Sequence, residues 1–143
     1  MYIYNSSLEM NNFDIDVQVI SPIPIMFSYW AEAKDALEES QLINDFISGV
    51  CEKYPKKFIG LGTIPMQSSK YAIKELERCK NDLSLKGVEI GTNVNDENLS
   101  EKKFFDIFSA CQDLDMAIFV HPWQMMGMSK MKKYWLPWLV GMP

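Results

Sequence analysis

The feature that most constrains the fold is a regular alternation of short apolar runs with longer helical segments. Each short run is rich in β-branched or apolar residues and has the length of a buried strand. Each longer segment has apolar positions at helical spacing. Because helices separate consecutive strands, the strands need crossover connections, and we expect a parallel sheet. The expected strands are residues 15–20, 58–64, 87–90 and 116–120, and the expected helices are about 34–53, 68–83 and 100–114.

Each expected helix presents one apolar stripe, which we expect to face the sheet. Asn98, followed by Glu101, is a modest start signal for the third helix. The stripes comprise Ile43, Phe46, Ile47, Val50 and Tyr54 in the first helix, Ile73, Leu76, Cys79 and Leu83 in the second, and Phe104, Phe108, Cys111 and Leu114 in the third.

Two architectures accommodate this element order: an open doubly wound sheet and a (β/α)8 barrel. Four strands cannot close a barrel, which needs eight strands and about 250 residues. The chain of 143 residues is therefore either a small open sheet or part of a larger barrel. Both ends favour the second option, because residues 8–13 have the pattern of a helix end and residues 135–143 are strongly apolar.

Charge and composition exclude several classes of protein. The chain has 48% hydrophobic residues, which is typical of a globular protein, and 19 acidic against 14 basic residues, which argues against nucleic-acid binding. No apolar run approaches the roughly 20 residues that span a bilayer, so we expect no membrane partner. The N-terminus has no signal-peptide pattern, and the three cysteines form no CxxC pair, which favours reduced thiols in the cytosol.

The ligand sites of parallel α/β folds lie at the carboxyl ends of the strands. His121, the only histidine, directly follows the expected strand 116–120, and Pro122 and Trp123 come next. An imidazole in that position can ligate a metal or transfer a proton near neutral pH. One histidine cannot hold a metal alone, so the chain lacks a complete zinc site as it stands.

Other catalytic signatures are missing from the sequence. It contains neither a nucleophile elbow of the Gly-x-Ser-x-Gly type nor a phosphate-binding glycine loop. Gly60 and Gly62 lie inside an expected strand, where they favour close backbone packing over dinucleotide binding. The sequence therefore singles out no catalytic residue.

Five sequence strings carry a resemblance to one enzyme family. They are residues 24–30 (PIMFSYW), 58–67 (FIGLGTIPMQ), 87–95 (GVEIGTNVN), 119–123 (FVHPW) and 133–143 (KYWLPWLVGMP). From about residue 8 to the end, the chain resembles the 2-amino-3-carboxymuconate-6-semialdehyde decarboxylase family of the amidohydrolase superfamily. The resemblance implies a distorted (β/α)8 barrel with zinc, a homodimer, and decarboxylation in the kynurenine branch of tryptophan catabolism.

The resemblance also implies roles for single residues. His121 resembles the metal-ligand histidine that ends the fifth barrel strand, so the expected strands are barrel strands two to five. Trp135 resembles an aromatic wall of the substrate pocket, with Met126 and Trp138 nearby. The family's N-terminal His-x-His pair, pocket arginine, later proton-transfer histidine and aspartate ligand have no counterpart here. One of the four metal ligands that the resemblance implies is therefore present.

We therefore expect residues 1–143 to be an internal fragment of a single amidohydrolase-type barrel domain, with the α/β fold of a partial (β/α)8 barrel. The expected function is that of a zinc-dependent carboxy-lyase acting on a small molecule, truncated and inactive alone. The alternatives are another decarboxylase or hydrolase of the superfamily, a non-catalytic fragment that docks on full-length subunits, and an incomplete gene model.

Overall fold

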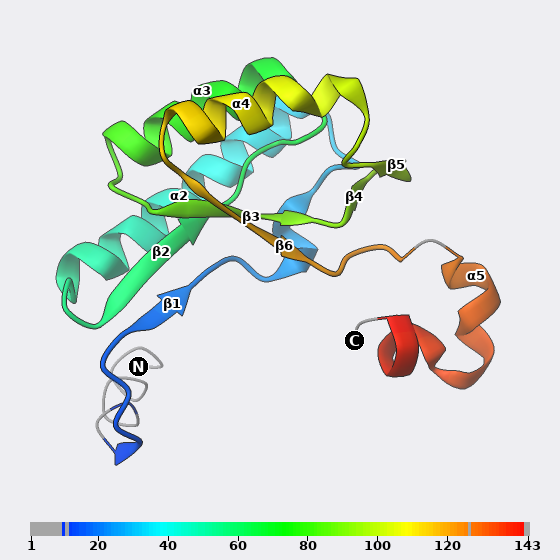
Figure 1. Cartoon of the computed structure of the whole chain (residues 1–143), viewed down its shortest axis with the longest axis horizontal. Helices are drawn as coiled ribbons and strands as arrows, with labels where there is room; N and C mark the ends of the chain where they lie inside the picture. The colour runs from blue at the N-terminus through cyan, green and yellow to red at the C-terminus, as the bar shows by residue number, and fades with distance from the viewer. Residues whose placement is uncertain (1–9, 11, 126, 142–143) are drawn as a thin grey trace.

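The computed structural model describes residues 10, 12–125 and 127–141. Within them, four strands form one sheet in the order β1-β2-β3-β6, and every neighbouring pair is parallel (Figure 1). The strands are β1 (Gln18–Ile20), β2 (Phe58–Gly62), β3 (Gly87–Gly91) and β6 (Ala117–His121). The connecting helices are α2 (Ala33–Lys53), α3 (Ser69–Asn81) and α4 (Phe105–Asp113).

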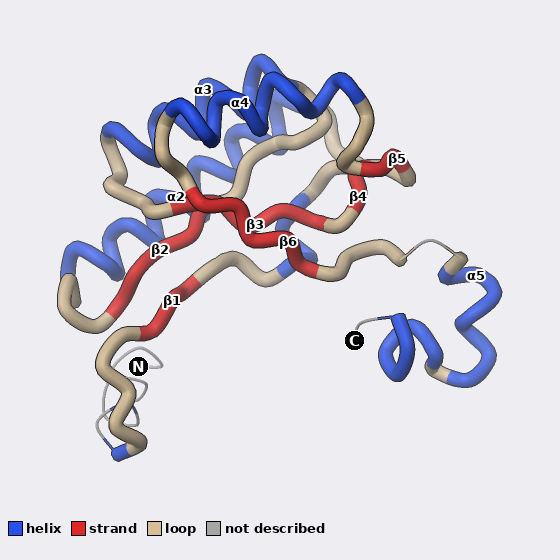
Figure 2. Tube along the Cα trace, viewed as in Figure 1, coloured by secondary structure: helices blue, strands red, loops and turns tan. Residues whose placement is uncertain are grey.

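Shorter elements occupy the connections and the C-terminal segment (Figure 2). The 3-10 turn η1 (Pro24–Phe27) follows β1, and the hairpin β4 (Asn93–Val94) and β5 (Glu97–Asn98) leads to η2 (Lys102–Phe104). After β6 come α5 (Met128–Met131), the 3-10 turn η3 (Lys132–Tyr134) and the π-helical turn η4 (Pro137–Gly141).

The three long helices cover the same face of the sheet (Figures 1 and 2). A doubly wound sheet would carry helices on both faces. A single outer layer of helices on a parallel sheet is the arrangement of a (β/α)8 barrel, and four strands make half of one. The expected partial barrel is therefore confirmed. No helix in the described part of the chain is long and apolar enough to cross a membrane.

Two of the expected strands are longer than the structure allows. The sequence predicts a strand from residue 15, but β1 begins at Gln18. Gln18 pairs with Phe58, the first residue of the partner strand β2, so pairing starts there. The sequence also extends the second strand to residue 64, but β2 ends at Gly62. The backbone N–H and C=O of Thr63 bond instead to the side chain of Asn44.

The third helix begins later than the sequence predicts. Asn98 does not start it, because this residue pairs with Asn93 in the β4–β5 hairpin. Asn95 and Asp96 form the turn with φ angles of 51° and 67°, a left-handed conformation that Asn and Asp tolerate in tight hairpins. The helix then begins with η2, and α4 itself starts at Phe105. Of the helix end expected at residues 8–13, residues 8, 9 and 11 lie outside the described residues.

The main hydrophobic core lies between the sheet and the helix layer. Val88 and Ile90 on β3 pack with Leu76 of α3 and Ile107 of α4, and each is at most 1% exposed. Burying a side chain of this size stabilises the fold by about 1.5–3 kcal/mol relative to exposure. This core holds the helices against the outer face of the sheet.

The apolar stripe expected on the first helix is wrong at one position. Phe46 is 68% exposed, whereas Asn44 is fully buried. Ser40 and Ser48 share the buried face of α2, and their hydroxyls donate to backbone carbonyls. Because polar side chains with internal partners occupy this face, the apolar periodicity alone misplaces Phe46.

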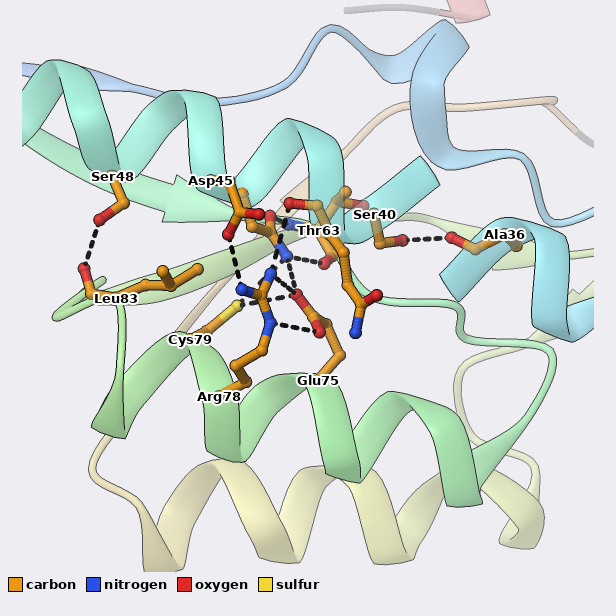
Figure 3. A network of polar contacts seen from close by, with 11 residues as sticks. Ala36, Ser40, Asp45, Ser48, Thr63, Glu75, Arg78, Cys79 and Leu83 are labelled. Atoms are coloured by element: carbon orange, nitrogen blue, oxygen red, sulfur yellow. Dashed lines mark hydrogen bonds and ion pairs between the residues drawn. The ribbon is translucent and has the colours of Figure 1, made fainter. Parts of the chain in front are cut away.

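A buried polar network joins α2, β2 and α3 (Figure 3). The side-chain amide of Asn44 donates to the Thr63 carbonyl at 2.9 Å and to Oε1 of Glu75 at 2.7 Å. The fully buried Glu75 accepts two hydrogen bonds from the guanidinium of Arg78, at 2.8 and 2.9 Å, and Arg78 also donates to Asp45. The hydrogen bonds to Glu75 raise the pKa of Arg78 above its ordinary value, and the bond to Asp45 adds a smaller effect in the same direction. This network fixes the carboxyl end of β2.

The sheet face opposite the helices, called here the inner face, is largely apolar and partly uncovered. A Cβ at Gly60 would meet Ile47 of α2, so the alternate residue Ile59 faces away from the helices. Ile59 pairs with Val19 on β1. On β6, Phe119 pairs with Glu89, which alternates with the helix-facing Val88 and Ile90, so Phe119 lies on the same face as Ile59. The side chains of Ile59, Val19 and Phe119 are 38%, 56% and 48% exposed, respectively. In a closed barrel the corresponding face is packed interior.

Candidate functional site

Hydrogen bonds hold together the loops at the carboxyl ends of β3 and β6. Gly91 and His121 are the last paired residues of the two strands. Beyond them, the N–H of Thr92 donates to the His121 carbonyl at 3.1 Å, and the side-chain amide of Asn93 donates to the Trp123 carbonyl at 2.8 Å. The N–H of Trp123 in turn donates to Oγ1 of Thr92 at 3.2 Å. These bonds fix the direction in which the chain leaves β6.

The loop after β1 joins the same unit through Tyr29. Its hydroxyl accepts a hydrogen bond from the N–H of Gly91 at 3.1 Å, and its ring stacks on Phe27 with centroids 5.5 Å apart. Phe27 meets Trp123 edge to face at 6.0 Å. Burial raises the pKa of Tyr29 above its ordinary value, so the phenol stays protonated at neutral pH. Three loops from separate strands therefore form one packed rim.

A pocket of about 700 Å³ lies between this rim and the C-terminal turns. Its size and its largely apolar lining suit a small organic ligand with one flat face. The lining comes from the loop after β1, the end of β6 and the segment that runs from α5 to η4. The lining residues are Ile23, Pro24, Ile25, His121, Pro122, Trp123, Gln124, Met125, Met128, Lys132, Trp135, Pro137 and Trp138.

The imidazole of His121 is oriented by its own backbone neighbour. Its Nδ1 lies 2.8 Å from the carbonyl oxygen of Pro122. Because a carbonyl can only accept, Nδ1 is the donor in this contact, and the neutral tautomer that it favours has the lone pair on Nε2. Metal-ligating histidines commonly donate their second ring N–H to a carbonyl in this way. This contact and the place of His121 at the end of β6 are compatible with the metal-ligand role predicted for it.

The rest of a metal site is not found in the described part of the chain. The described residues contain no group of three or more His, Cys, Asp or Glu side chains that could hold an ion. Catalytic metal sites usually have about three protein ligands. His121 thus fits one position of such a site, and the remaining described residues do not complete it.

Three of the four site residues expected from the sequence come together in the structure. His121, Trp135 and Trp138 all line the pocket, although the two indoles are 74% and 62% exposed. The fourth, Met126, lies outside the described residues. The structure thus groups these residues around one cavity, and their individual roles stay predictions.

Sequence reasoning missed two charged residues, one in the pocket lining and one in the middle of β3. Lys132 in η3 lines the pocket. Glu89 on β3 is 1% exposed, and its Oε2 has no hydrogen-bond partner among the described residues. Glu89 pairs with Phe119, so it lies on the inner face of the sheet. A lone acidic residue in an otherwise apolar strand is the signal that could have identified it.

Comparisons with known proteins identify the relatives of this chain. The amidohydrolase family model matches residues 8–134. A 2-amino-3-carboxymuconate-6-semialdehyde decarboxylase from Dictyostelium discoideum is 51% identical over 135 residues, which are 94% of this chain and 38% of that protein. The decarboxylase of the same name from Caenorhabditis elegans is 29% identical, with 94% and 46% covered. The chain thus spans less than half the length of these relatives.

A solved structure carries a similar fold. The 5-carboxyvanillate decarboxylase of Novosphingobium aromaticivorans, with bound manganese and a nitrobenzoic acid ligand, superimposes with a TM-score of 0.76 and 27% identity. The match covers 82% of this chain and 34% of that one. The amidohydrolase family model matches most of the length of this chain. The chain therefore belongs to the amidohydrolase family.

Proposed function

We propose that this chain carries part of the active site of a decarboxylase that acts on 2-amino-3-carboxymuconate 6-semialdehyde, in the kynurenine branch of tryptophan catabolism. The observation that carries the proposal is the position of His121, which ends β6 and lines the apolar pocket beside Trp135 and Trp138. The 51% identity to the Dictyostelium decarboxylase supports this substrate over the benzoates of more distant relatives.

In this reaction the bond between a substrate carbon and its carboxylate breaks, carbon dioxide leaves, and a proton takes its place. The residues of this chain bind and orient the substrate. The indoles of Trp135 and Trp138 and the side chain of Met128 offer flat, apolar surfaces to a conjugated chain.

We assign His121 as one ligand of a divalent metal, through Nε2. When bound, such a metal acts as a Lewis acid and lowers the pKa of a bound water. We propose zinc, while the related carboxyvanillate decarboxylase structure holds manganese. Because the described residues supply no group of three ligands, we expect the 143-residue chain to bind zinc weakly and to have no turnover alone. We further propose that residues 1–143 belong to one barrel domain of a cytosolic homodimer without membrane or nucleic-acid partners.

A chimera tests this function directly. The matching 135-residue stretch of the Dictyostelium decarboxylase is replaced by that of this chain, and loss of the semialdehyde is followed spectroscopically. We expect the chimera to decarboxylate and to contain metal. Its His121→Ala variant should lose both metal and activity, while Gln112→Ala, an exposed change on α4, should keep both. A folded, metal-loaded chimera without activity would contradict the proposal.

The 143-residue chain itself provides a second test. Purified with zinc or manganese, it should show neither stoichiometric metal nor turnover. Stoichiometric metal together with turnover would contradict the expected inactivity of the isolated chain.

The uncovered inner face of the sheet favours a second candidate function, that of a non-catalytic fragment that docks on full-length decarboxylase subunits. Val19, Ile59 and Phe119 on this face are well exposed, and exposed apolar patches mark interaction sites. In this case the purified chain would co-elute with a full-length subunit and lower its activity. Failure to co-elute would contradict this candidate and leave the chimera test unaffected.

A further inference from the structure

The C-terminal part of the chain has a charge opposite to that of the whole. The full sequence has a net charge of -5, yet no Asp or Glu follows Asp115, and the same stretch contains Lys130, Lys132 and Lys133. This segment forms one wall of the pocket. The pocket is therefore bounded on one side by a segment whose charged residues are all basic.

The three lysines are not equivalent in the structure. Lys132 lines the pocket, whereas Lys130 and Lys133 are not among the lining residues. The ammonium of Lys133 instead lies over the ring of Tyr134, 5.2 Å from its centroid. No carboxylate in the described part of the chain forms an ion pair with Lys132. Lys132 therefore adds a cation to a lining that is otherwise largely apolar.

We propose that Lys132 is a specificity-determining residue that makes this pocket select ligands with a carboxylate. The inference rests on the proposed function, whose substrate is a carboxylated conjugated chain. The tryptophan and methionine walls bind the flat apolar part of such a ligand, and the ammonium of Lys132 binds a carboxylate oxygen. Because Lys132 is exposed, water partly screens this ion pair, and its contribution to binding is that of a surface pair.

A pair of ligands that differ by one carboxylate isolates this contribution. Decarboxylation of 2,6-dihydroxybenzoate gives resorcinol, which has the same ring and hydroxyls without the negative charge. Binding of both to the purified 143-residue chain is measured by isothermal titration calorimetry. We expect the wild-type chain to prefer the benzoate by about fivefold, the size of one partly exposed ion pair. Added salt should reduce that preference.

Three variants assign the preference to one side chain. Lys132→Met should bring the preference close to one without changing the affinity for resorcinol, and Lys132→Arg should preserve it. Lys133→Met, which removes the same charge next to Lys132, should retain the preference. A Lys132→Met chain that still prefers the benzoate would overturn the inference, as would an equal loss in Lys133→Met.

The same titrations separate this inference from the proposed function. Equal binding of the two ligands to the wild-type chain would contradict the role of Lys132 and leave the pocket as a ring-binding site. Binding of neither ligand would contradict both the role of Lys132 and the assignment of the cavity as a substrate pocket. A functional chimera combined with equal binding would sustain the proposed function alone.

Discussion

The side chain of Asn44 hydrogen-bonds both backbone groups of Thr63, accepting from its N–H at 2.8 Å and donating to its carbonyl oxygen at 2.9 Å. A neighbouring strand would normally satisfy these groups. The pairing of β1 with β2 ends at Ile20 and Gly60, however, three residues before Thr63. A polar side chain of α2 therefore takes the place of a strand at the edge where the site lies.

Replacing Asn44 by leucine, which has a similar volume, should destabilise the chain strongly. The N–H and C=O of Thr63 would remain buried without partners, and unsatisfied buried groups cost about 1–3 kcal/mol each. We expect the free energy of unfolding to fall by about 3 kcal/mol or more, measured by urea denaturation followed by circular dichroism. Asn81→Leu, at an exposed position of α3, serves as the control and should change stability little. A loss below about 1 kcal/mol in Asn44→Leu would show that the network is dispensable.

Two glycine substitutions should have effects of opposite sign. A Cβ at Gly87 would collide with the carbonyl oxygen of Ala117 in the paired strand β6, which is backbone and cannot move aside. Gly87→Ala should therefore destabilise by about 1–3 kcal/mol, as overpacking does. Gly49, within α2, has nothing near its missing Cβ, so Gly49→Ala should stabilise by about 0.5–1 kcal/mol. Thermal melts of both variants check the sign, and a neutral Gly87→Ala would contradict the close strand packing.

The buried thiols should make stability decline at alkaline pH. Burial raises the pKa of Cys111 to about 11, whereas an unfolded thiol titrates near 8.5. Between these two values the unfolded chain releases a proton that the folded chain retains. The contribution of the Cys111 thiol to the free energy of unfolding is therefore fully present below about pH 8.5 and is lost as the pH rises toward 11. Urea midpoints measured from pH 7.5 to 10.5 should fall. The decline of the urea midpoint with pH should be shallower in both Cys111→Ala and Cys111→Ser. An unchanged decline in both variants would contradict an origin in the Cys111 thiol.

The sequence predicts the repeating part of the fold well and its exceptions poorly. The strand and helix order follows from periodicity, because four apolar runs and three amphipathic segments leave few ways to bury their faces. The same reasoning misplaces Phe46, which is exposed while Asn44 is buried. Periodicity cannot show that all polar side-chain atoms of Asn44 find hydrogen-bond partners inside the protein. The β4–β5 hairpin is missed for another reason: its signal is only the pair Asn95-Asp96, which tolerates positive φ.

The candidate site is predictable where it depends on strand ends. His121 directly follows the strand expected at residues 116–120, so its place at the carboxyl edge of the sheet can be derived from the sequence. The contribution of Lys132 cannot, because it depends on how the C-terminal turns fold back beside the loop after β6. Glu89 lies within an apolar strand, and alternation along β3 does not say whether an acidic side chain faces solvent or the barrel interior.

Glu89→Gln should raise the stability of the isolated chain at neutral pH. The carboxyl group is almost fully buried, and its Oε2 lacks a hydrogen-bond partner among the described residues. Burying a charge without full compensation is costly, and glutamine keeps the shape of the side chain while removing the charge. We expect a gain of about 1 kcal/mol in urea denaturation at pH 7. Glu101→Gln, at an exposed position, is the matched control and should leave stability unchanged within about 0.5 kcal/mol. If Glu89→Gln instead lowers stability, the carboxylate has a stabilising partner in the folded chain, and the inner face of β3 is more polar than its register indicates.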